Sequence, residues 1–491
     1  MLYKSTRDSG DAKFTSAEVI KRGIAEDGGL YVPAEIPALG RDEIEKLRQM
    51  PYSERAVFIL LKFLDDYSYD ELLADCKAAY SAESFPGGPA PLARLDDRLY
   101  SLELWHGPTA AFKDMALQLM PRLLTRALKK TGEGRTVHIL VATSGDTGKA
   151  ALEGFKDIDQ TRITVFYPEC GVSLVQKRQM ATQTGSNVDV CAVRGNFDDC
   201  QNGVKRLFSD IELAAELDRR GYFLSSANSI NWGRLVPQIV YYVSAYCELL
   251  NSGALKLGEK FCVCVPTGNF GNILAGYFAG LMGIPIKKLI CASNLNNVLT
   301  DFLRQGRYDR NRTFHKTMSP SMDILISSNL ERLLYYVAGA EKTRKYTAEL
   351  GKTGCYQISG EEKDKISEKF IGYFADETET PATISSIFEK YGYLCDTHTA
   401  VAFSCAEKYR QETGDDSIIT VVSTASPYKF AGDVYRALTG SDPAGEFEAF
   451  DQLHSLTGVP IPYPLAGIGS RPVRFTTSVD KEEMKKYILG M

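Results

Sequence analysis

Between residues 137 and 423 the sequence repeatedly places a short apolar run before a longer stretch with helical spacing. The runs predicted as buried strands are 137–142, 163–167, 188–193, 261–265, 288–292 and 418–423. The stretches predicted as helices are 149–155, 172–184, 197–219, 235–251, 273–281 and 400–411. Strands separated by helices of this length pair in parallel and are covered on both faces. The sequence therefore predicts an α/β protein with two doubly wound lobes and mainly parallel sheets.

The rest of the chain suggests how these lobes are divided. Residues 1–95 are predicted as a mostly helical N-terminal domain that ends near the breaker-rich segment Phe85-Pro86-Gly87-Gly88-Pro89. We expect a smaller α/β lobe over 96–245 and a larger one over 246–491. Within the larger lobe, the charged and Tyr-rich stretch 304–377 has few strand signals and is predicted as a helical insertion.

Charge and composition argue against several classes of protein. A formal charge of −5 over 491 residues, without runs of Lys or Arg, argues against nucleic acid as a partner. No run of 18 apolar residues is present, so no membrane span is predicted, and the first residues lack the pattern of a signal peptide. The 11 scattered cysteines favour buried reduced thiols over a metal or disulfide site. We expect a cytoplasmic protein without a metal, as a monomer or homodimer.

The most informative side chain is Lys113, which lies between an aromatic ring and a carboxylate in Phe112-Lys113-Asp114. Residues 105–111 before it are predicted as a tight loop, and helical spacing begins at about Asp114. Near a helix N-terminus and out of water, a lysine has a disfavoured ammonium form, which is what an amine that forms a Schiff base needs. Taken alone, the tripeptide also fits a surface lysine at a helix start.

A glycine-rich loop over 265–272 follows one predicted strand and opens a predicted helix. Its free backbone N–H groups and the positive end of the helix dipole suit a phosphate. The pattern is not G-x-G-x-x-G, and no acidic ribose partner is evident about twenty residues on, so a dinucleotide is disfavoured. These residues alone also fit a glycine-rich turn without a ligand.

Three further polar segments follow or adjoin predicted strands. Residues 143–148 offer hydroxyls and N–H groups suited to a carboxylate, or they simply cap the next helix. Residues 225–234 combine amides, hydroxyls and Arg234, which suits a phosphate monoester, although a polar helix cap fits equally well. Residues 422–430 close the last strand with hydroxyls, including that of Thr424, which on their own fit an ordinary turn.

Taken in order, these segments resemble the threonine synthase family, pyridoxal-phosphate enzymes of the tryptophan-synthase-β fold type (fold type II). The similarity spans nearly the whole chain and is strongest to the longer bacterial and fungal branch. The motifs that carry it are Ser5-Thr6-Arg7, Asp27-Gly28-Gly29-Leu30-Tyr31-Val32-Pro33, His106-Gly107-Pro108-Thr109, Phe112-Lys113-Asp114, Ser144-Gly145-Asp146-Thr147-Gly148, Asn228-Ser229-Ile230-Asn231-Trp232-Gly233-Arg234, Gly268-Asn269-Phe270-Gly271-Asn272 and Ser423-Thr424-Ala425.

The resemblance implies a role for each matching position. Lys113 would link covalently to pyridoxal phosphate, and Thr424 would face the pyridine nitrogen. The residues that would hold the cofactor phosphate are Gly268, Asn269, Phe270, Gly271 and Asn272. Those that would meet the substrate carboxylate are Ser144, Asp146 and Thr147. Those that would hold the substrate phosphate are Asn228, Ser229 and Arg234.

The implied activity is conversion of O-phospho-L-homoserine and water to L-threonine and phosphate, the last step of threonine biosynthesis. It proceeds by γ-elimination and β-addition of water, with Lys113 moving protons. One alternative is a phospholyase on the same scaffold that yields a 2-oxo acid. Another is a non-catalytic protein that binds pyridoxal phosphate or a small anion.

Overall fold

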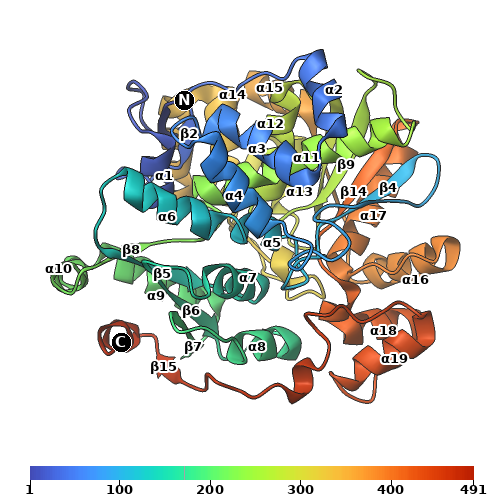
Figure 1. Ribbon diagram of the computed structural model, residues 1–491. Coiled ribbons are helices and arrows are strands. Elements are labelled where there is room, and N and C mark those ends of the chain that lie inside the picture. Colours follow the sequence, from blue (N-terminus) through green and yellow to red (C-terminus); the bar gives the residue numbers. More distant parts are fainter. Residues whose placement is uncertain (171) are drawn as a thin grey trace.

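The computed structural model describes residues 1–170 and 172–491 and contains two sheets whose strands are mainly parallel (Figure 1). In spatial order, the larger sheet consists of β13 (Phe370–Phe374), β10 (Ile286–Ser293), β9 (Phe261–Pro266), β14 (Ile419–Ser423), β4 (Leu99–Glu103) and β3 (Leu92–Arg94). The smaller one consists of β15 (Ser478–Asp480), β7 (Val188–Arg194), β6 (Thr161–Pro168), β5 (Thr136–Ala142) and β8 (Tyr222–Ser225). Within these two sheets the described pairs are parallel except β3 with β4. The predicted fold class is confirmed.

Strand β9 explains why these runs are apolar throughout rather than alternating. Phe261, Val263 and Val265 point into the same core as α11 (Trp232–Asn251) and α12 (Gly271–Met282). Cys262 and Cys264 point into a second core, beside α17 (Thr397–Thr413). A strand in a parallel sheet with helices on both faces has no solvent side, so each position is apolar.

The smaller lobe differs from the prediction at one helix. Its helices are α5 (Asp114–Leu117), α6 (Met120–Lys130), α7 (Asp146–Phe155), α8 (Leu174–Ala181), α9 (Phe197–Ser209), α10 (Ile211–Arg219) and α20 (Met484–Leu489). The single helix predicted over 197–219 is wrong, because the chain breaks at Asp210. The Asp210 carboxylate accepts the Leu213 N–H at 2.9 Å and so caps a new helix.

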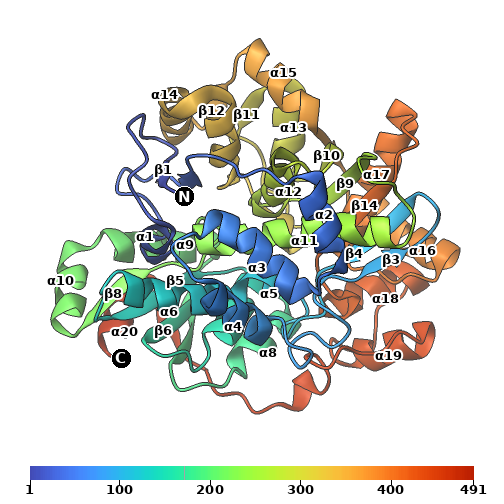
Figure 2. The same cartoon turned by 45° about the horizontal axis from the view of Figure 1, so that its top comes forward.

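The N-terminal region forms a mostly helical layer. Its elements are β1 (Tyr3–Ser5), α1 (Ser16–Arg22), β2 (Tyr31–Pro33), α2 (Arg41–Gln49), α3 (Tyr52–Phe63) and α4 (Tyr69–Ala79). Figure 2 shows α3 lying across α11, the long buried helix at the centre of the molecule. The ring of Trp232, at the start of α11, packs against Tyr3 and Phe63 of this layer, with ring centroids 5.5 and 5.8 Å apart. The layer therefore braces the helix that carries Arg234.

The segment predicted as a helical insertion over 304–377 is not purely helical. It holds the end of α13 (Val298–Gln305), then β11 (Arg307–Asp309), α14 (Leu330–Thr353), β12 (Cys355–Gln357), α15 (Gly360–Lys369) and β13. Strands β11 and β12 pair with each other, whereas β13 pairs with β10 and forms one edge of the larger sheet. These strands are short, and nothing local distinguishes them from the charged surroundings. The insertion is mainly helical, as predicted, and the three short strands within it were not predicted from the sequence.

Strand pairing also crosses the expected division of the chain at residues 95 and 245. Strand β4 pairs with β14 in the larger sheet, and β15, near the C-terminus, pairs with β7 in the smaller one. After α16 (Glu379–Tyr391), α18 (Ala431–Thr439) and α19 (Glu448–Thr457), the chain runs back to the smaller lobe (Figure 1). Arg178 of α8 holds this segment by donating to the Gly469 and Arg471 carbonyls at 2.7 and 3.0 Å. The domain boundaries themselves stay a prediction.

Among the described residues, no helix is both long enough and apolar enough to cross a membrane. The same part of the chain holds no group of three or more His, Cys, Asp or Glu side chains placed to bind a metal ion. All 11 cysteines are free thiols.

Candidate active site

Lys113 is held where the loop after β4 enters α5, and the neighbouring backbone fixes its position. Ala111 forms a β-bridge with Ala425, and the Phe112 N–H donates to the Thr424 carbonyl at 2.8 Å. These contacts place the Lys113 loop beside the end of β14. The structure thus brings together Lys113 and Thr424, which are far apart in sequence.

The surroundings of Lys113 disfavour its charged form. The side chain is buried, with its Nζ 4.7 Å from the centroid of the Phe112 ring and 3.4 Å from Asp146 Oδ2. Burial lowers the pKa of Lys113, and the nearby Arg234 and Lys429 cations lower it further, against the opposing pull of Asp146. The amine is therefore biased toward the neutral form that a nucleophile or base requires.

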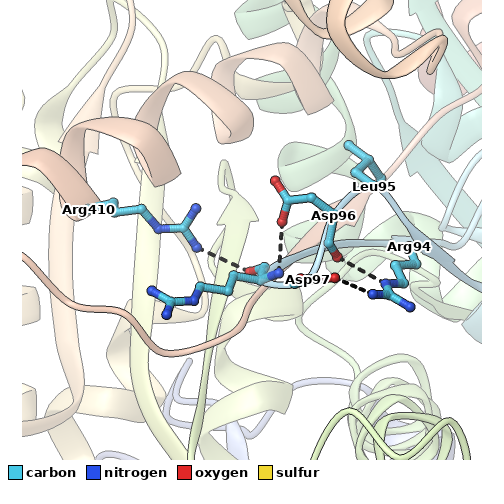
Figure 3. Close-up of a pocket in the computed structure, with 6 residues that line it drawn as sticks. Arg94, Leu95, Asp96, Asp97 and Arg410 are labelled. Atoms are coloured by element: carbon cyan, nitrogen blue, oxygen red, sulfur yellow. Dashed lines mark hydrogen bonds and ion pairs between the residues drawn. The ribbon is translucent and has the colours of Figure 1, made fainter.

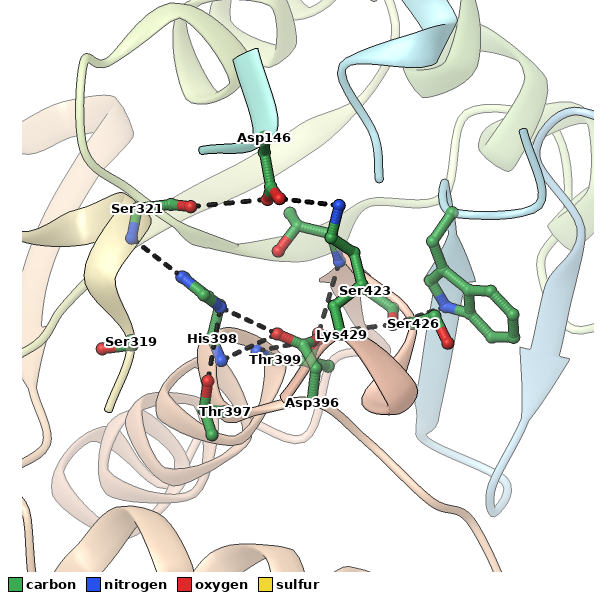
Figure 4. Close-up of polar contacts among 12 residues, drawn as sticks. Asp146, Ser319, Ser321, Asp396, Thr397, His398, Thr399, Ser423, Ser426 and Lys429 are labelled. Carbon is green, nitrogen blue, oxygen red and sulfur yellow. Dashed lines mark hydrogen bonds and ion pairs between the residues drawn. The ribbon is translucent and has the colours of Figure 1, made fainter. Parts of the chain in front are cut away.

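Asp146, the first residue of α7, is itself a paired anion. Its Oδ1 lies 2.8 Å from Lys429 Nζ (Figure 4). The same oxygen accepts the Gln176 Nε2–H at 2.8 Å. Burial alone would raise its pKa, but the Lys429 and Lys113 ammonium groups hold the pKa of Asp146 well below its usual range. An ionised carboxylate repels another carboxylate, so this side chain does not suit the expected contact with a substrate carboxylate.

The rest of the 143–148 loop is still suited to binding a carboxylate. Thr143 Oγ1 accepts the N–H groups of Gly145 and Gly148 at 3.0 and 2.9 Å, which folds the loop tightly. Gly145 has φ 146°, and a Cβ there would lie 2.4 Å from the Gln176 side chain, so only glycine fits. The first N–H groups of a helix have no intrahelical acceptor. Together with the half-buried hydroxyls of Ser144 and Thr147, they form a setting for a small anion.

Arg234, near the start of α11, is a buried cation whose hydrogen-bond acceptors are neutral groups. Its guanidinium donates to the Ala227 carbonyl at 3.1 Å and to Thr147 Oγ1 at 3.3 Å. Burial lowers the pKa of Arg234 to about 10, and no charge of a neighbouring carboxylate among the described residues opposes this shift. A buried charge without a counter-ion is costly, which favours an anion beside it.

The loop before Arg234 reaches the glycine-rich loop through hydroxyl contacts. Ser229 Oγ lies 3.4 Å from Ser328 Oγ, which donates to Asn269 Oδ1 at 3.4 Å. The backbone N–H of Asn228 donates to Ser226 Oγ at 3.2 Å. The two phosphate-type loops predicted from sequence are thus linked in space.

The glycine-rich loop is held in a conformation that needs support. Phe270 has φ 62° and ψ 1°, a left-handed conformation that costs a bulky residue about 1–2 kcal/mol. Its ring is buried, and its centroid lies 5.6 Å from that of Phe370. Asn329 donates to the Asn269 carbonyl from both its backbone N–H, at 3.1 Å, and its Nδ2, at 2.9 Å. A Cβ on Gly268 would lie 2.8 Å from the Ser321 carbonyl, so the loop is also closely covered.

The side-chain amide of Asn272 indicates whether this loop fits a phosphate. Its Oδ1 accepts the hydroxyls of Tyr241 and Tyr242, each at 2.6 Å, which fixes the orientation of the amide. Its Nδ2 is buried and has no hydrogen-bond partner among the described residues. A buried donor without an acceptor is unfavourable, and a bound phosphate would supply one. The loop at the N-terminus of α12 therefore fits a phosphorylated cofactor, with Lys113 and Thr424 nearby.

Several residues of the site were missed by the sequence reasoning. Figure 4 shows four of them, Lys429, Ser321, Asp396 and His398. The other two are Gln176 and Gln179. His398 Nδ1 lies 2.9 Å from Asp396 Oδ1, and its Nε2 accepts the Ser321 N–H at 3.1 Å, which fixes the segment over Gly268. Lys429 could have been suspected because it lies five residues after Thr424. No feature of the sequence singles out the other five residues.

A separate surface cavity lies away from this site. It has a volume of about 630 Å³ and is lined by Arg94, Leu95, Asp96, Asp97, Arg98 and Arg410 (Figure 3). Its charges are satisfied locally, because Arg94 pairs with Asp97 and the Arg98 N–H donates to Asp96 Oδ1 at 2.8 Å. It shares no residue with the cluster around Lys113.

Comparison with known proteins gives three family models that together cover most of the chain. They are described as threonine synthase N terminus over residues 2–80, pyridoxal-phosphate dependent enzyme over 84–424, and threonine synthase, C-terminal, over 399–488. The chain is 39% identical to threonine synthase of Pseudomonas aeruginosa over 90% of this chain and 92% of that protein. It is 43% identical to human threonine synthase-like 1 over 87% of this chain, but spans only 58% of that relative's length.

The solved structures agree. A PLP-bound threonine synthase from Brucella melitensis superposes with a TM-score of 0.87 at 37% identity, covering 99% of this chain and 98% of that one. The match extends over both lobes and the N-terminal layer. The chain therefore belongs to the threonine synthase family of pyridoxal-phosphate dependent enzymes.

Proposed function

We propose that the chain converts O-phospho-L-homoserine and water to L-threonine and phosphate. The observation that carries this proposal is that two settings suited to anions adjoin the buried surroundings of Lys113. One is the Asn272 loop, with its unpartnered amide, and the other is Arg234, a buried cation without a carboxylate. An enzyme that uses a phosphorylated cofactor on a phosphorylated substrate needs two such sites.

Pyridoxal phosphate fits the residues present. Lys113 would link to it, Gly268–Asn272 at the N-terminus of α12 would hold its phosphate, and Thr424 would face its ring nitrogen. When bound, the cofactor withdraws electrons from the carbon that bears the substrate amine, which makes protons on that carbon acidic. A hydroxyl at Thr424, rather than a carboxylate, would leave the ring nitrogen unprotonated.

The chain's own side chains would bind and move protons. Arg234, with Asn228 and Ser229, would hold the substrate phosphate at Cγ and keep it close after it leaves. Lys113 Nζ would take and return protons at Cα and Cβ, and its lowered pKa makes the neutral amine available for this. The departing phosphate is a candidate base for the water that adds at Cβ. Ser144, Thr147 and the first N–H groups of α7 would orient the carboxylate.

Asp146 takes a different role in this proposal from the one the sequence suggested. Because it is ionised and lies 3.4 Å from Lys113 Nζ, we assign it to the electrostatics of the lysine rather than to the substrate carboxylate. The assignment predicts that the Asp146→Asn variant changes the pH profile of the reaction more than its KM.

The deciding experiment uses purified protein, pyridoxal phosphate and O-phospho-L-homoserine, with phosphate, threonine and 2-oxobutyrate all quantified. Threonine equal to phosphate supports the proposal. Phosphate with 2-oxobutyrate and little threonine identifies a phospholyase instead. No phosphate release, together with cofactor binding, leaves a protein that binds pyridoxal phosphate for another purpose.

Two finer expectations stay predictions. A cytoplasmic location rests on the free thiols of all 11 cysteines, since reducing compartments keep thiols unpaired. A monomeric or homodimeric state is expected from the family resemblance, and size-exclusion chromatography with light scattering measures it directly.

A further inference from the structure

Lys429 is a second lysine within the site, and three acceptors surround its Nζ. It belongs to the short helix η2 (Pro427–Phe430) and is fully buried. Its Nζ lies 2.8 Å from Asp146 Oδ1, 2.9 Å from Gln179 Oε1 and 3.1 Å from the Thr109 carbonyl. The Lys429 amine therefore contacts one carboxylate and two further acceptors, which fix its position.

The two oxygens of Asp146 have different partners. Oδ1 contacts Lys429 and Gln176, both at 2.8 Å, whereas Oδ2 faces Lys113 at 3.4 Å and Ser321 Oγ at 3.5 Å. Figure 4 shows the contacts with Lys429 and Ser321. The carboxylate therefore lies between two lysines at unequal distances. Because Asp146 lies closer to Lys429 than to Lys113, its electrostatic attraction to Lys429 is the stronger of the two.

From this geometry we propose that Lys429 is a positioning residue, which fixes Asp146 and takes up much of its charge so that Lys113 can give up its proton. The inference rests on the proposed role of Lys113 as the cofactor lysine. It assigns no contact between Lys429 and substrate.

The charges around Lys113 give the sign of the effect. The charged groups that face it are Asp146, Arg234 and Lys429. Loss of the Lys429 charge would remove one repulsion and would leave Asp146 with Lys113 as its remaining lysine partner. Both changes raise the proton affinity of Lys113. A side chain that only filled space would leave this affinity unchanged.

The test follows the lysine Nζ signals of the full-length, cofactor-free protein by nitrogen-15 NMR against pH. Lys429→Gln removes the charge but can still donate hydrogen bonds, and Lys429→Arg is the matched variant that keeps the charge. A Lys113→Arg protein identifies the Lys113 signal. We expect the Lys113 midpoint to rise by about one pH unit, about tenfold in proton affinity, in Lys429→Gln. The rise should be much smaller in Lys429→Arg. An unshifted midpoint in folded Lys429→Gln overturns the proposal, as does an equal shift in both variants.

Two further measurements keep the test decisive. If Lys429→Gln does not fold, Lys429→Met is measured in its place, and the Lys113 midpoint should rise in the same direction. An unshifted midpoint in that folded variant refutes the proposal. With pyridoxal phosphate bound, the pH midpoint of the cofactor's visible absorbance should shift in the same variant. None of these readouts depends on turnover, so failure of the proposed reaction and failure of the Lys429 role are told apart.

Discussion

Two aspartates are buried close to Lys113, and their surroundings give them different proton affinities. Asp114 follows Lys113 in the chain and accepts the Thr109 N–H at 2.8 Å and the Thr109 hydroxyl at 2.7 Å, both neutral donors. Burial raises the pKa of Asp114 to about 6, although these hydrogen bonds oppose the rise. Asp146 is equally buried, yet two lysines hold its pKa well below the usual range.

The difference teaches that the partner, rather than burial, decides the charge of a carboxylate in this site. Burial penalises the charged form of both aspartates, but only Asp146 has cations close enough to outweigh the penalty. The same contrast separates the cations, since Lys429 has a carboxylate partner at 2.8 Å whereas Arg234 donates to neutral oxygens. The absence of a carboxylate partner beside Arg234 among the described residues agrees with the proposed contact between Arg234 and the substrate phosphate.

The largest effect is expected from removing Lys113, the lysine on the Oδ2 side of Asp146. Lys113→Ala should lower threonine formation by about 10²- to 10⁴-fold, since the proton-transferring amine is lost. The measurement is the steady-state rate with cofactor and substrate in excess. Lys129→Ala, exposed on α6, is the matched control and should keep full activity. A Lys113→Ala rate within tenfold of wild type would contradict the site assignment.

The next effect compares the two aspartates directly. At about pH 5, Asp146→Asn leaves the buried Lys429 without its carboxylate and should lower the free energy of unfolding by about 3–5 kcal/mol. Asp114→Asn at the same pH replaces a largely protonated group and should cost about 1 kcal/mol or less. Urea unfolding followed by circular dichroism measures both. Equal losses in the two variants would show that partner charge is not the deciding factor.

The pH dependence of stability gives a third test. The pKa of Asp114 is about 6 in the folded state and 3.8 as a model value, so the stability it contributes is fully present below about pH 4. This contribution is lost as the pH rises through 6, by about 3 kcal/mol in total. The unfolding free energy of wild type minus that of Asp114→Asn should therefore fall by this amount between about pH 4 and pH 7. For Asp146, whose pKa is lowered, the contribution is instead lost as the pH falls below the unfolded pKa.

If the difference in unfolding free energy between wild type and Asp114→Asn did not change between about pH 4 and pH 7, the raised pKa of Asp114 would be contradicted. The Asp146→Asn protein serves as the control of opposite sign, because its difference from wild type should shrink only on the acid side.

The smallest effect concerns the cation without a carboxylate. Arg234→Met strands no buried carboxylate, so the unfolding free energy should stay within about 1 kcal/mol of wild type. The KM for the phosphorylated substrate should nevertheless rise about 10- to 100-fold, because charge-assisted hydrogen bonds to phosphate are lost. Initial rates over a range of substrate concentrations give this value. An unchanged KM would remove Arg234 from the substrate phosphate site.

Much of the fold could be predicted because its signals are local. The six apolar runs are all strands, and both faces of each sheet are buried, so a continuous apolar run was a reliable sign. The break at Asp210 was missed because the apolar spacing continues across it and only a side-chain cap separates the helices. Strands β8 and β13 were missed because they lie at sheet edges, where pairing supplies what the local pattern lacks.

For the site, the sequence by itself determined which side chains could do the chemistry. Lys113, the 268–272 loop, Arg234 and Thr424 are each recognisable by residue type and by their place after a strand or before a helix, and the ordered set resembles one family. Such signals depend only on neighbours in the chain.

Only the tertiary structure decided how these groups are charged. Asp146 lies 33 residues from Lys113 in sequence, and Gln179 lies 250 residues from Lys429, yet all four meet in one network. Electrostatic interaction depends on distance in space and on burial, which the order of residues does not encode. The sequence was therefore enough to single out Lys113. The tertiary structure decided that Asp146 is ionised and that the pKa of Asp114 is raised.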